Sequence, residues 1–227
     1  DVDAASLFQR FQELDFESDL LNDASTEEMM EKFKEIKDNK EALKEADCLI
    51  VALLTHGKEG VLYTTDGEIK ITSLLYEFSA ENCPELRLKP KIFIIQACRG
   101  SAVGSGVNLK VIRDADPNQA DAAAVYEEYD QTFGQSVRIP NDADFLTVFA
   151  SSEGYGAFRN TKDGSPFVRV LSEELLKMRK GEDFYKILTR VNRRVGTGFI
   201  PKFNQTKNAT QMPCFVSHLT KDLVLKP

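Results

Sequence analysis

Apolar residues in this chain occur both as continuous runs and as stripes with helical spacing. Two continuous runs, at residues 48–54 and 91–97, have the length and character of strands that are buried on both faces of a sheet. Stripes in which apolar residues recur every three or four positions predict helices. The expected helices span residues 3–14, 25–43, 72–79, 167–175 and 184–195. Because strands alternate with helices, the pattern predicts an α/β fold with a mostly parallel sheet and helices on both faces.

Shorter apolar segments predict the remaining elements. The segment 61–71 is typical of a hairpin, because Asp66-Gly67 is a favoured two-residue turn between two strand-like halves. The helix that begins near Ser25 has Glu28 three residues later, which is the pattern of a capping box. Further strands are expected at 145–151, 214–219 and 223–225.

The regular pattern breaks between about residues 100 and 140. This stretch is rich in Gly, Ala, Asp, Gln and Asn and shows no sustained period. A loop of this length is uncommon inside a compact domain unless it is functional or disordered. We therefore expect two ordered halves of one sheet that are joined by a loose linker.

Composition narrows the class of protein and of partner. With 227 residues, 42% hydrophobic and 29% charged, the chain has the make-up of an ordinary globular protein. A net charge of −7 argues against a nucleic acid as partner, and no apolar run approaches the roughly 18 residues that would argue for a membrane. The four cysteines show no spacing typical of disulfides or metal sites, which favours a reducing, cytoplasmic location.

The candidate chemistry lies at the ends of the two continuous runs. His56 follows the first run, and Cys98 follows the second inside the motif Gln-Ala-Cys-Arg-Gly at 96–100. Open α/β sheets place their sites at such strand ends. A thiol is a weak nucleophile until it becomes a thiolate or is helped by a base, and His56 would be that base. The other histidine, His218, lies within a strand pattern and is expected to be structural.

This combination of motifs resembles a known family. A Gln-Ala-Cys-Arg-Gly motif with a histidine about 50 residues upstream is the pattern of the caspases, and here His56 lies 42 residues before Cys98. The chain therefore resembles the caspases, cysteine proteases that cleave after aspartate, and in particular their effector type. The resemblance covers essentially the whole chain and implies a caspase-like (hemoglobinase-type) sheet of about six strands. It also implies catalysis without a metal or an organic cofactor.

The resemblance assigns the catalytic roles. Cys98 would attack the scissile carbonyl, and His56 would act as acid and base. The backbone N–H groups of Gly57 and Cys98 would bind the developing oxyanion, a contribution of roughly 3–4 kcal/mol per donor in other proteases. Glycine at position 57 fits a close approach between backbone and substrate.

The resemblance also assigns the recognition of aspartate. A pocket for a carboxylate needs charge-assisted donors, which arginine offers in a planar fork. Gln96 would line this pocket from within the motif, and Arg159 would bind both the substrate aspartate and the substrate backbone. The substrate-binding residues implied in this way are Gln96, Ala157, Phe158, Arg159 and Asn160.

Three positions near this pocket depart from the family. Caspases usually have an aromatic residue at the position of Gly156 and a tryptophan at that of Phe158. Pro166 stands where effector caspases usually have the tryptophan that lines the fourth pocket. Glycine at 156 predicts broader selection for the residue before the aspartate, and Pro166 leaves the preference in the fourth pocket open.

The resemblance begins after the family's first strand. In caspases, a strand and a loop precede the segment that residues 1–7 match, and that loop carries the other arginine of the aspartate pocket. The sequence given contains neither. We therefore expect a fragment or a naturally shortened form, whose activity depends on what the missing segment supplies.

The linker implies an activation step. Caspase zymogens are cut after linker aspartates, and Asp114 and Asp121 are each followed by alanine, which does not obstruct a protease. We expect a large-subunit region at 1–114, an excisable segment at 115–121 and a small-subunit region at 122–227. The alternative is that these acidic residues only keep the loop solvated.

The resemblance implies partners and a setting as well. The implied partners are protein substrates with aspartate at the cleaved bond, an upstream activating caspase and caspase inhibitors. The implied assembly is a homodimer that pairs edge strands near 214–225. The implied role is in apoptosis, in the cytoplasm and the nucleus. Two alternatives differ in class: an inactive caspase-like regulator, and a related protease that cuts after basic residues. The pair of Cys98 and His56 argues against the first. Gln96 with Arg159 has the wrong charge for the second.

Overall fold

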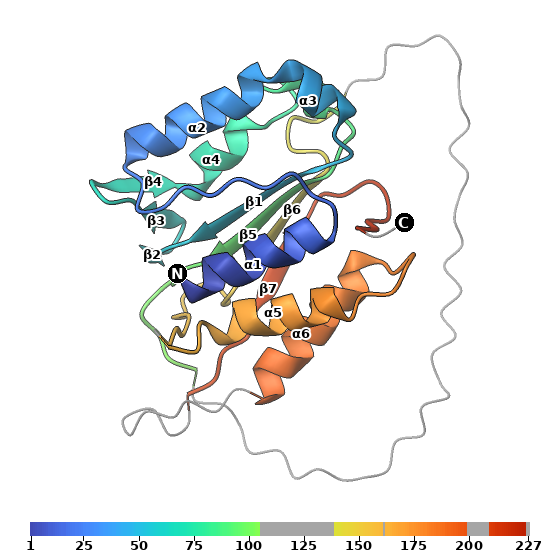
Figure 1. The fold of residues 1–227 in the computed structure, drawn as a ribbon. Coiled ribbons are helices and arrows are strands. Elements are labelled where there is room, and N and C mark those ends of the chain that lie inside the picture. The colour runs from blue at the N-terminus through green and yellow to red at the C-terminus, as the bar shows by residue number, and fades with distance from the viewer. Residues whose placement is uncertain (105–138, 161, 199–208, 226–227) are drawn as a thin grey trace.

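The main sheet has four strands in the computed structural model, which describes residues 1–104, 139–160, 162–198 and 209–225. In spatial order the strands are β1 (Leu49–Leu54), β5 (Lys91–Gln96), β6 (Phe145–Phe149) and β7 (Cys214–Ser217). The first three run parallel, and β7 pairs with β6 in the antiparallel direction (Figure 1). The two halves of the sequence therefore meet within one sheet, between β5 and β6.

Helices cover both faces of this sheet (Figure 1). One face carries α1 (Val2–Glu13), α5 (Pro166–Leu176) and α6 (Phe184–Gly198). The other carries α2 (Thr26–Asp38), α3 (Lys40–Glu45) and α4 (Ile71–Glu77), with a 3-10 turn at Pro84–Leu86. The α/β architecture predicted from the alternation of strands and helices is confirmed.

β5 is the centre of the core, and all six of its residues are buried. Side chains alternate across a strand, so Ile92 and Ile94 pack on the side of α1, α5 and α6. Phe93 and Ile95 pack on the opposite side, with residues of α2 and α4. A strand that is buried on both faces is apolar over most of its length, which explains the run at 92–95 between the two polar ends, Lys91 and Gln96.

A small antiparallel sheet follows β1 and consists of β2 (Gly57–Lys58), β3 (Val61–Tyr63) and β4 (Glu68–Lys70). The predicted hairpin is thus present, but its turn lies one residue earlier than expected. The Thr64 N–H donates to the Gly67 carbonyl at 3.0 Å, so the central residues are Thr65 and Asp66. The Asp66 carboxylate accepts the backbone N–H of Thr26 at 2.8 Å, which ties the turn to the start of α2.

Two other expectations differ from the structure. The helix expected over 25–43 is interrupted at Asn39, which ends α2 and caps α3, because its side chain accepts the Ala42 N–H at 3.3 Å. The segment 223–225 forms a single bridge instead of a strand. Leu223 and Leu225 are buried in the core beside α6, and this packing accounts for their apolar character. Among the described residues, the main sheet therefore has four strands where about six were expected.

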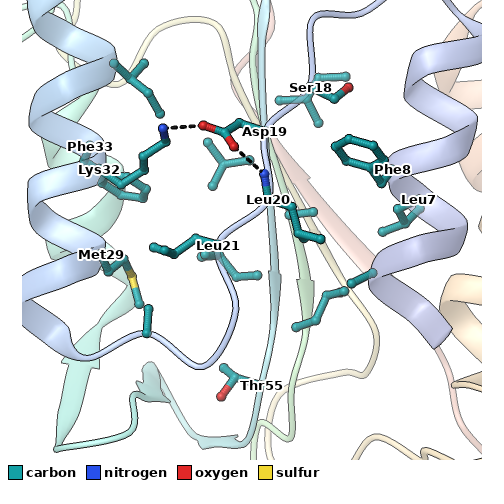
Figure 2. Close-up of a pocket in the computed structure, with 18 of the residues that line it drawn as sticks. Leu7, Phe8, Ser18, Asp19, Leu20, Leu21, Met29, Lys32, Phe33 and Thr55 are labelled. Atoms are coloured by element: carbon teal, nitrogen blue, oxygen red, sulfur yellow. Dashed lines mark hydrogen bonds and ion pairs between the residues drawn. The ribbon is translucent and has the colours of Figure 1, made fainter. Parts of the chain in front are cut away.

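β1 is an edge strand that pairs only with β5 among the described residues. Its other edge lines a pocket of about 470 Å³, whose further walls come from α1, α2 and the chain between them. In Figure 2, Phe8 enters this pocket from the α1 side and Met29 from the α2 side. Asp19 forms an ion pair with Lys32 across one part of it. The lining reaches Thr55 but includes neither His56 nor Cys98.

Candidate active site

The register of two neighbouring strands brings the candidate catalytic residues together. Leu54 is paired with Gln96 at the carboxyl ends of β1 and β5. The Thr55 N–H donates to the Gln96 carbonyl at 3.0 Å, which extends the pairing by one residue. His56 and Cys98 then leave the sheet at the same edge, each two residues beyond a paired position.

Gly57 allows the backbone after β1 to approach the backbone at Val61 and Cys98 closely. A Cβ atom at this position would lie 2.6 Å from the Val61 carbonyl oxygen and 3.1 Å from that of Cys98. The backbone of His56 is held as well, because its carbonyl accepts the Tyr63 N–H at 2.9 Å. The imidazole itself is exposed. The small sheet therefore fixes the backbone of His56 beside Cys98 and leaves its side chain open to a ligand.

The thiol of Cys98 is half-buried and contacts the backbone of one residue, Ala157. Sγ accepts the Ala157 N–H at 3.4 Å and can donate to the Ala157 carbonyl at 3.6 Å. The nucleophile is the thiolate, so attack on a substrate requires the S–H proton to be transferred away from the carbonyl of Ala157.

Arg99 anchors the residue that follows the candidate nucleophile. Its guanidinium lies 3.9 Å above the ring of Phe149, and Nη1 is 3.4 Å from Sγ of Cys214. Nη2 is 3.6 Å from the carboxylate of Glu153. Burial raises the pKa of the Cys214 thiol, and the Arg99 charge acts in the opposite direction. These contacts fix the loop at Cys98 against β6 and β7.

Gln96 is buried at the end of β5, directly before the candidate site. Its Oε1 atom has no hydrogen-bond partner within the part of the chain that the structure describes. A buried polar atom without a partner costs about 1–3 kcal/mol, so such atoms call for an explanation. A site that is completed by a polar ligand would supply one.

Arg159 projects from the loop after β6 toward the start of α1. Its Nη2 forms an ion pair with Asp1, and its Nε lies 3.9 Å from the Asp3 carboxylate. The neighbouring Asn160 uses its side chain locally, where Oδ1 accepts the Lys162 N–H at 2.8 Å. Of the substrate-binding residues predicted from the sequence, Gln96 and Ala157 adjoin Cys98, whereas Asn160 caps its own turn.

Thus the structure joins a half-buried thiol, an exposed imidazole and an arginine-bearing loop at one edge of the sheet. A family model described as a caspase domain matches residues 1–224. The chain belongs to the caspase family. Its members are cysteine proteases, so a cysteine and a histidine at adjacent strand ends have the chemistry expected of this caspase.

Individual relatives agree with the family assignment. Caspase-3 of Oryctolagus cuniculus is 37% identical over 225 residues, which cover 98% of this chain and 74% of that protein. Caspase-7 of Gallus gallus is 36% identical over 228 residues, which cover 98% of this chain and 69% of that protein. The crystal structure of caspase-1 from Spodoptera frugiperda superposes with a TM-score of 0.81 at 34% identity, covering 99% of this chain and 80% of that one. The predicted resemblance to effector caspases and the predicted fold are both confirmed.

Two further residues hold the site of this caspase together and were missed from the sequence. Gln211 is buried, accepts the Phe158 N–H at 2.9 Å and donates to the Ala150 carbonyl at 2.8 Å. Asp3 is buried at the start of α1 and accepts the Ser165 N–H. Nothing in the sequence marks Gln211, which lies in an irregular segment. An acidic residue in the first turn of a helix, such as Asp3, suggests only a favourable helix end.

Several predictions concern residues outside the described ranges. Asp114, Asp121 and the predicted subunit boundaries beside them fall in 105–138, so they remain predictions. Within the described ranges, no group of three or more His, Cys, Asp or Glu side chains could hold a metal ion. No helix in those ranges is long and apolar enough to cross a membrane.

Proposed function

We propose that this caspase is an endopeptidase that cleaves proteins after aspartate. The observation that carries the proposal is the position of His56 and Cys98 at the carboxyl ends of paired strands, with the loop that bears Arg159 held against the Cys98 sulfur through Ala157. The three side chains supply a nucleophile, a base and a charge complementary to the residue at the cleaved bond. The family assignment supports the cysteine chemistry.

In the proposed reaction, His56 takes the proton of the Cys98 thiol, and the sulfur forms a bond to the scissile carbonyl carbon. The carbonyl oxygen takes the negative charge and is bound by the N–H groups of Gly57 and Cys98, the arrangement known as an oxyanion hole. The C–N bond then breaks, and His56 gives a proton to the leaving amine. Water, activated by the same imidazole, hydrolyses the thioester, so that Cys98 is restored and the product ends in a carboxylate.

Charge explains the choice of aspartate. A guanidinium in a partly desolvated pocket favours a carboxylate and disfavours lysine or arginine. Gln96 adds a buried side-chain amide, whose NH₂ group can donate a hydrogen bond to the same carboxylate. A pocket built for hydrogen bonds rejects analogues that leave its groups unpaired, so aspartate should be preferred over asparagine by a factor of about 10² or more.

The test is a matched set of four fluorogenic peptides that differ only at the cleaved position, which is aspartate, asparagine, glutamate or lysine. The purified full-length protein should cleave the aspartate peptide, and His56→Ala should lower kcat at least about 10²-fold. Equal cleavage of the aspartate and asparagine peptides would contradict the proposed pocket. Activity that survives in a clean preparation of Cys98→Ala would contradict the proposed mechanism.

We also propose how this caspase is activated, how it assembles and in which process it acts. We infer activation by cleavage after Asp114 and Asp121, assembly as a homodimer through β7, and a role in apoptosis in the cytoplasm and nucleus. β7 supports the dimer, because it lies at the edge of the sheet and exposes Val216. An activating caspase and caspase inhibitors would be the regulatory partners. Sizing the protein by light scattering and probing the linker by mass spectrometry test these points separately.

The internal contacts of Cys98 and Arg159 favour a second candidate function, regulation of another caspase. The Cys98 sulfur contacts Ala157 and Arg159 is bound to Asp1, so both side chains have internal partners in this structure. A caspase-like regulator would retain these contacts and act by pairing with an active relative. Adding the Cys98→Ala protein to an active caspase distinguishes the two, because a regulator alters the rate of the relative without any turnover of its own.

A further inference from the structure

The start of α1 lies against the loop that carries Arg159. Asp1 is the N-cap of α1, and its Oδ1 accepts the Asp3 N–H at 2.9 Å. Its Oδ2 forms the ion pair with Nη2 of Arg159. Asp3, two residues later, is 3.9 Å from Nε of the same guanidinium. Two carboxylates from one helix end therefore meet two different nitrogen atoms of one arginine.

The carboxylate of Asp3 is buried and held by hydrogen bonds. Asp3 is only 2% exposed. The backbone nitrogen of Ser165 donates to both of its carboxylate oxygens, at 2.8 Å to Oδ1 and 3.1 Å to Oδ2. A buried carboxylate is costly without compensating charge, and within the described ranges Arg159 is the one cation within ion-pair distance of it. Gly164 lets the loop come this close, because its φ is +75° and a Cβ there would lie 2.4 Å from Asp3 Oδ1.

The same contact joins two helices. Ser165 is the N-cap of α5, and its side chain accepts the Val168 N–H at 3.3 Å. Pro166 occupies the first turn of α5, where a missing N–H costs nothing. Asp3 thus connects the starts of α1 and α5 and also contacts Arg159.

The two carboxylates contact the guanidinium in different ways. Arg159 donates a hydrogen bond to Asp1, whose side chain is 25% exposed, so another carboxylate can take its place. Asp3 lies 3.9 Å from the guanidinium, is 3% exposed and is itself held in place by the Ser165 N–H. Nη1 of Arg159 has no partner within the described ranges.

We propose that Asp1 and Asp3 form a two-carboxylate holder that sets both the position and the availability of Arg159. Asp3 is a positioning residue that fixes the Nε edge of the guanidinium. Asp1 is an internal competitor that occupies Nη2 until the aspartate of a substrate takes its place. The proposal rests on the proposed function in so far as the displacing group is a substrate aspartate.

The kinetic test uses an amide of each acid. Asp1→Asn keeps the N-cap and removes the competing charge, so KM for an aspartate peptide should fall about two- to fivefold with kcat little changed. Asp3→Asn keeps one acceptor for Ser165 but loses the anchoring charge, so KM should rise roughly tenfold or more. Asp15→Asn, which removes the same charge beyond the other end of α1, is the control and should leave both constants unchanged.

A second readout does not depend on turnover. Phenylglyoxal modifies accessible guanidinium groups, and peptide mapping by mass spectrometry follows each arginine separately. Arg159 should be modified faster in Asp1→Asn than in the wild type, with the exposed Arg169 as internal reference in the same digest. Equal rates for Arg159 in the two proteins would overturn the holder, even if Asp3→Asn fails to fold. A rate difference in a protein that does not cleave aspartate peptides would uphold the holder and reject the proposed function.

Discussion

Leu54 lies directly opposite Gln96 in the parallel ladder between β1 and β5. Because His56 and Cys98 each follow these residues by two positions, their spacing is set by the register of the two strands. A slip by one residue would exchange the side chains that a strand presents to its two faces and so disturb the close packing on both. The packing of Ile94 and Ile95 on opposite faces of β5 therefore also fixes where the candidate catalytic residues meet.

Cys98→Ala should abolish turnover and leave the fold almost intact. The substitution removes one sulfur atom from a half-buried position whose contacts are with the backbone of Ala157. The loss of stability should stay below about 1 kcal/mol, the range for changes that leave no large cavity. Thermal unfolding checks stability, and the aspartate peptide checks activity. A large drop in melting temperature would show that the sulfur has a structural role.

Gly57→Ala should destabilise the protein by about 1–3 kcal/mol and lower kcat, because the new Cβ would lie 2.6 Å from the Val61 carbonyl oxygen. Gly67→Ala is the matched control in the same small sheet, since its Cβ would meet only ordinary contacts, at 3.7 Å or more. Denaturant unfolding of the two variants measures the difference. Equal stabilities would mean that the strands can separate at Gly57 without cost.

The charge network between α5 and α6 should make stability depend on acid pH. Burial acts to raise the pKa of Glu174, but hydrogen bonds from Arg190 and Arg194 outweigh it and hold the pKa below its ordinary value. A carboxyl whose pKa is lower in the folded state contributes stability above its unfolded pKa of about 4.3, and this is lost as the pH falls through the folded value. The melting temperature of the wild type should therefore fall between about pH 5 and pH 3.

Glu174→Gln tests whether the ion pairs of Glu174 cause the loss of stability at acid pH. It should lower the free energy of unfolding at pH 7 by about 2–4 kcal/mol and flatten the acid limb, because the two arginines lose a buried anionic partner. Glu173→Gln is the control, since Glu173 is 42% exposed and its ion pair with Arg194 should contribute less than about 1 kcal/mol. An unchanged acid limb in Glu174→Gln would assign the pH dependence to other groups.

The double variant Asp114→Ala, Asp121→Ala should remain a single chain under conditions in which the wild type splits. Both aspartates lie in a stretch without apolar period, where a backbone can extend into a protease cleft, and both precede alanine. The wild type should release 115–121 and leave a fragment that begins at Ala122. Asp116→Ala is the control and should split normally, because Pro117 disfavours a cut after Asp116. Intact mass spectrometry identifies each product, and splitting of the double variant would move the switch elsewhere.

The parts of the fold that follow from local pattern were predictable from the sequence. The apolar run before Cys98 became β5 and the run before His56 became β1, because neighbouring strands covered by helices are mostly apolar. The break at Asn39 was not predictable, because an asparagine inside a helical stripe carries no sign of whether its side chain will cap a new helix. Leu223 misled the prediction, since an apolar residue that covers a core resembles a strand residue.

In the candidate site, too, some features were predictable from the sequence and others were not. The positions of His56 and Cys98 follow from strand ends, which a sequence reveals. The engagement of Arg159 by Asp1 and Asp3 joins residues about 160 positions apart, and no periodicity reports such a contact. Gln211 is similar, because its importance depends on the backbone atoms that it meets after folding.

One edge of β1 has no strand partner among the described residues, and this has a consequence for the handling of the chain. Its sequence, Leu-Ile-Val-Ala-Leu-Leu, contains neither a charge nor a proline, the features by which natural sheets prevent other chains from adding to an open edge. A second molecule that displaced the chain between α1 and α2 from this edge could continue the hydrogen-bond ladder over six residues. The shelf life of a preparation should therefore be governed by its concentration and storage history more than by its melting temperature.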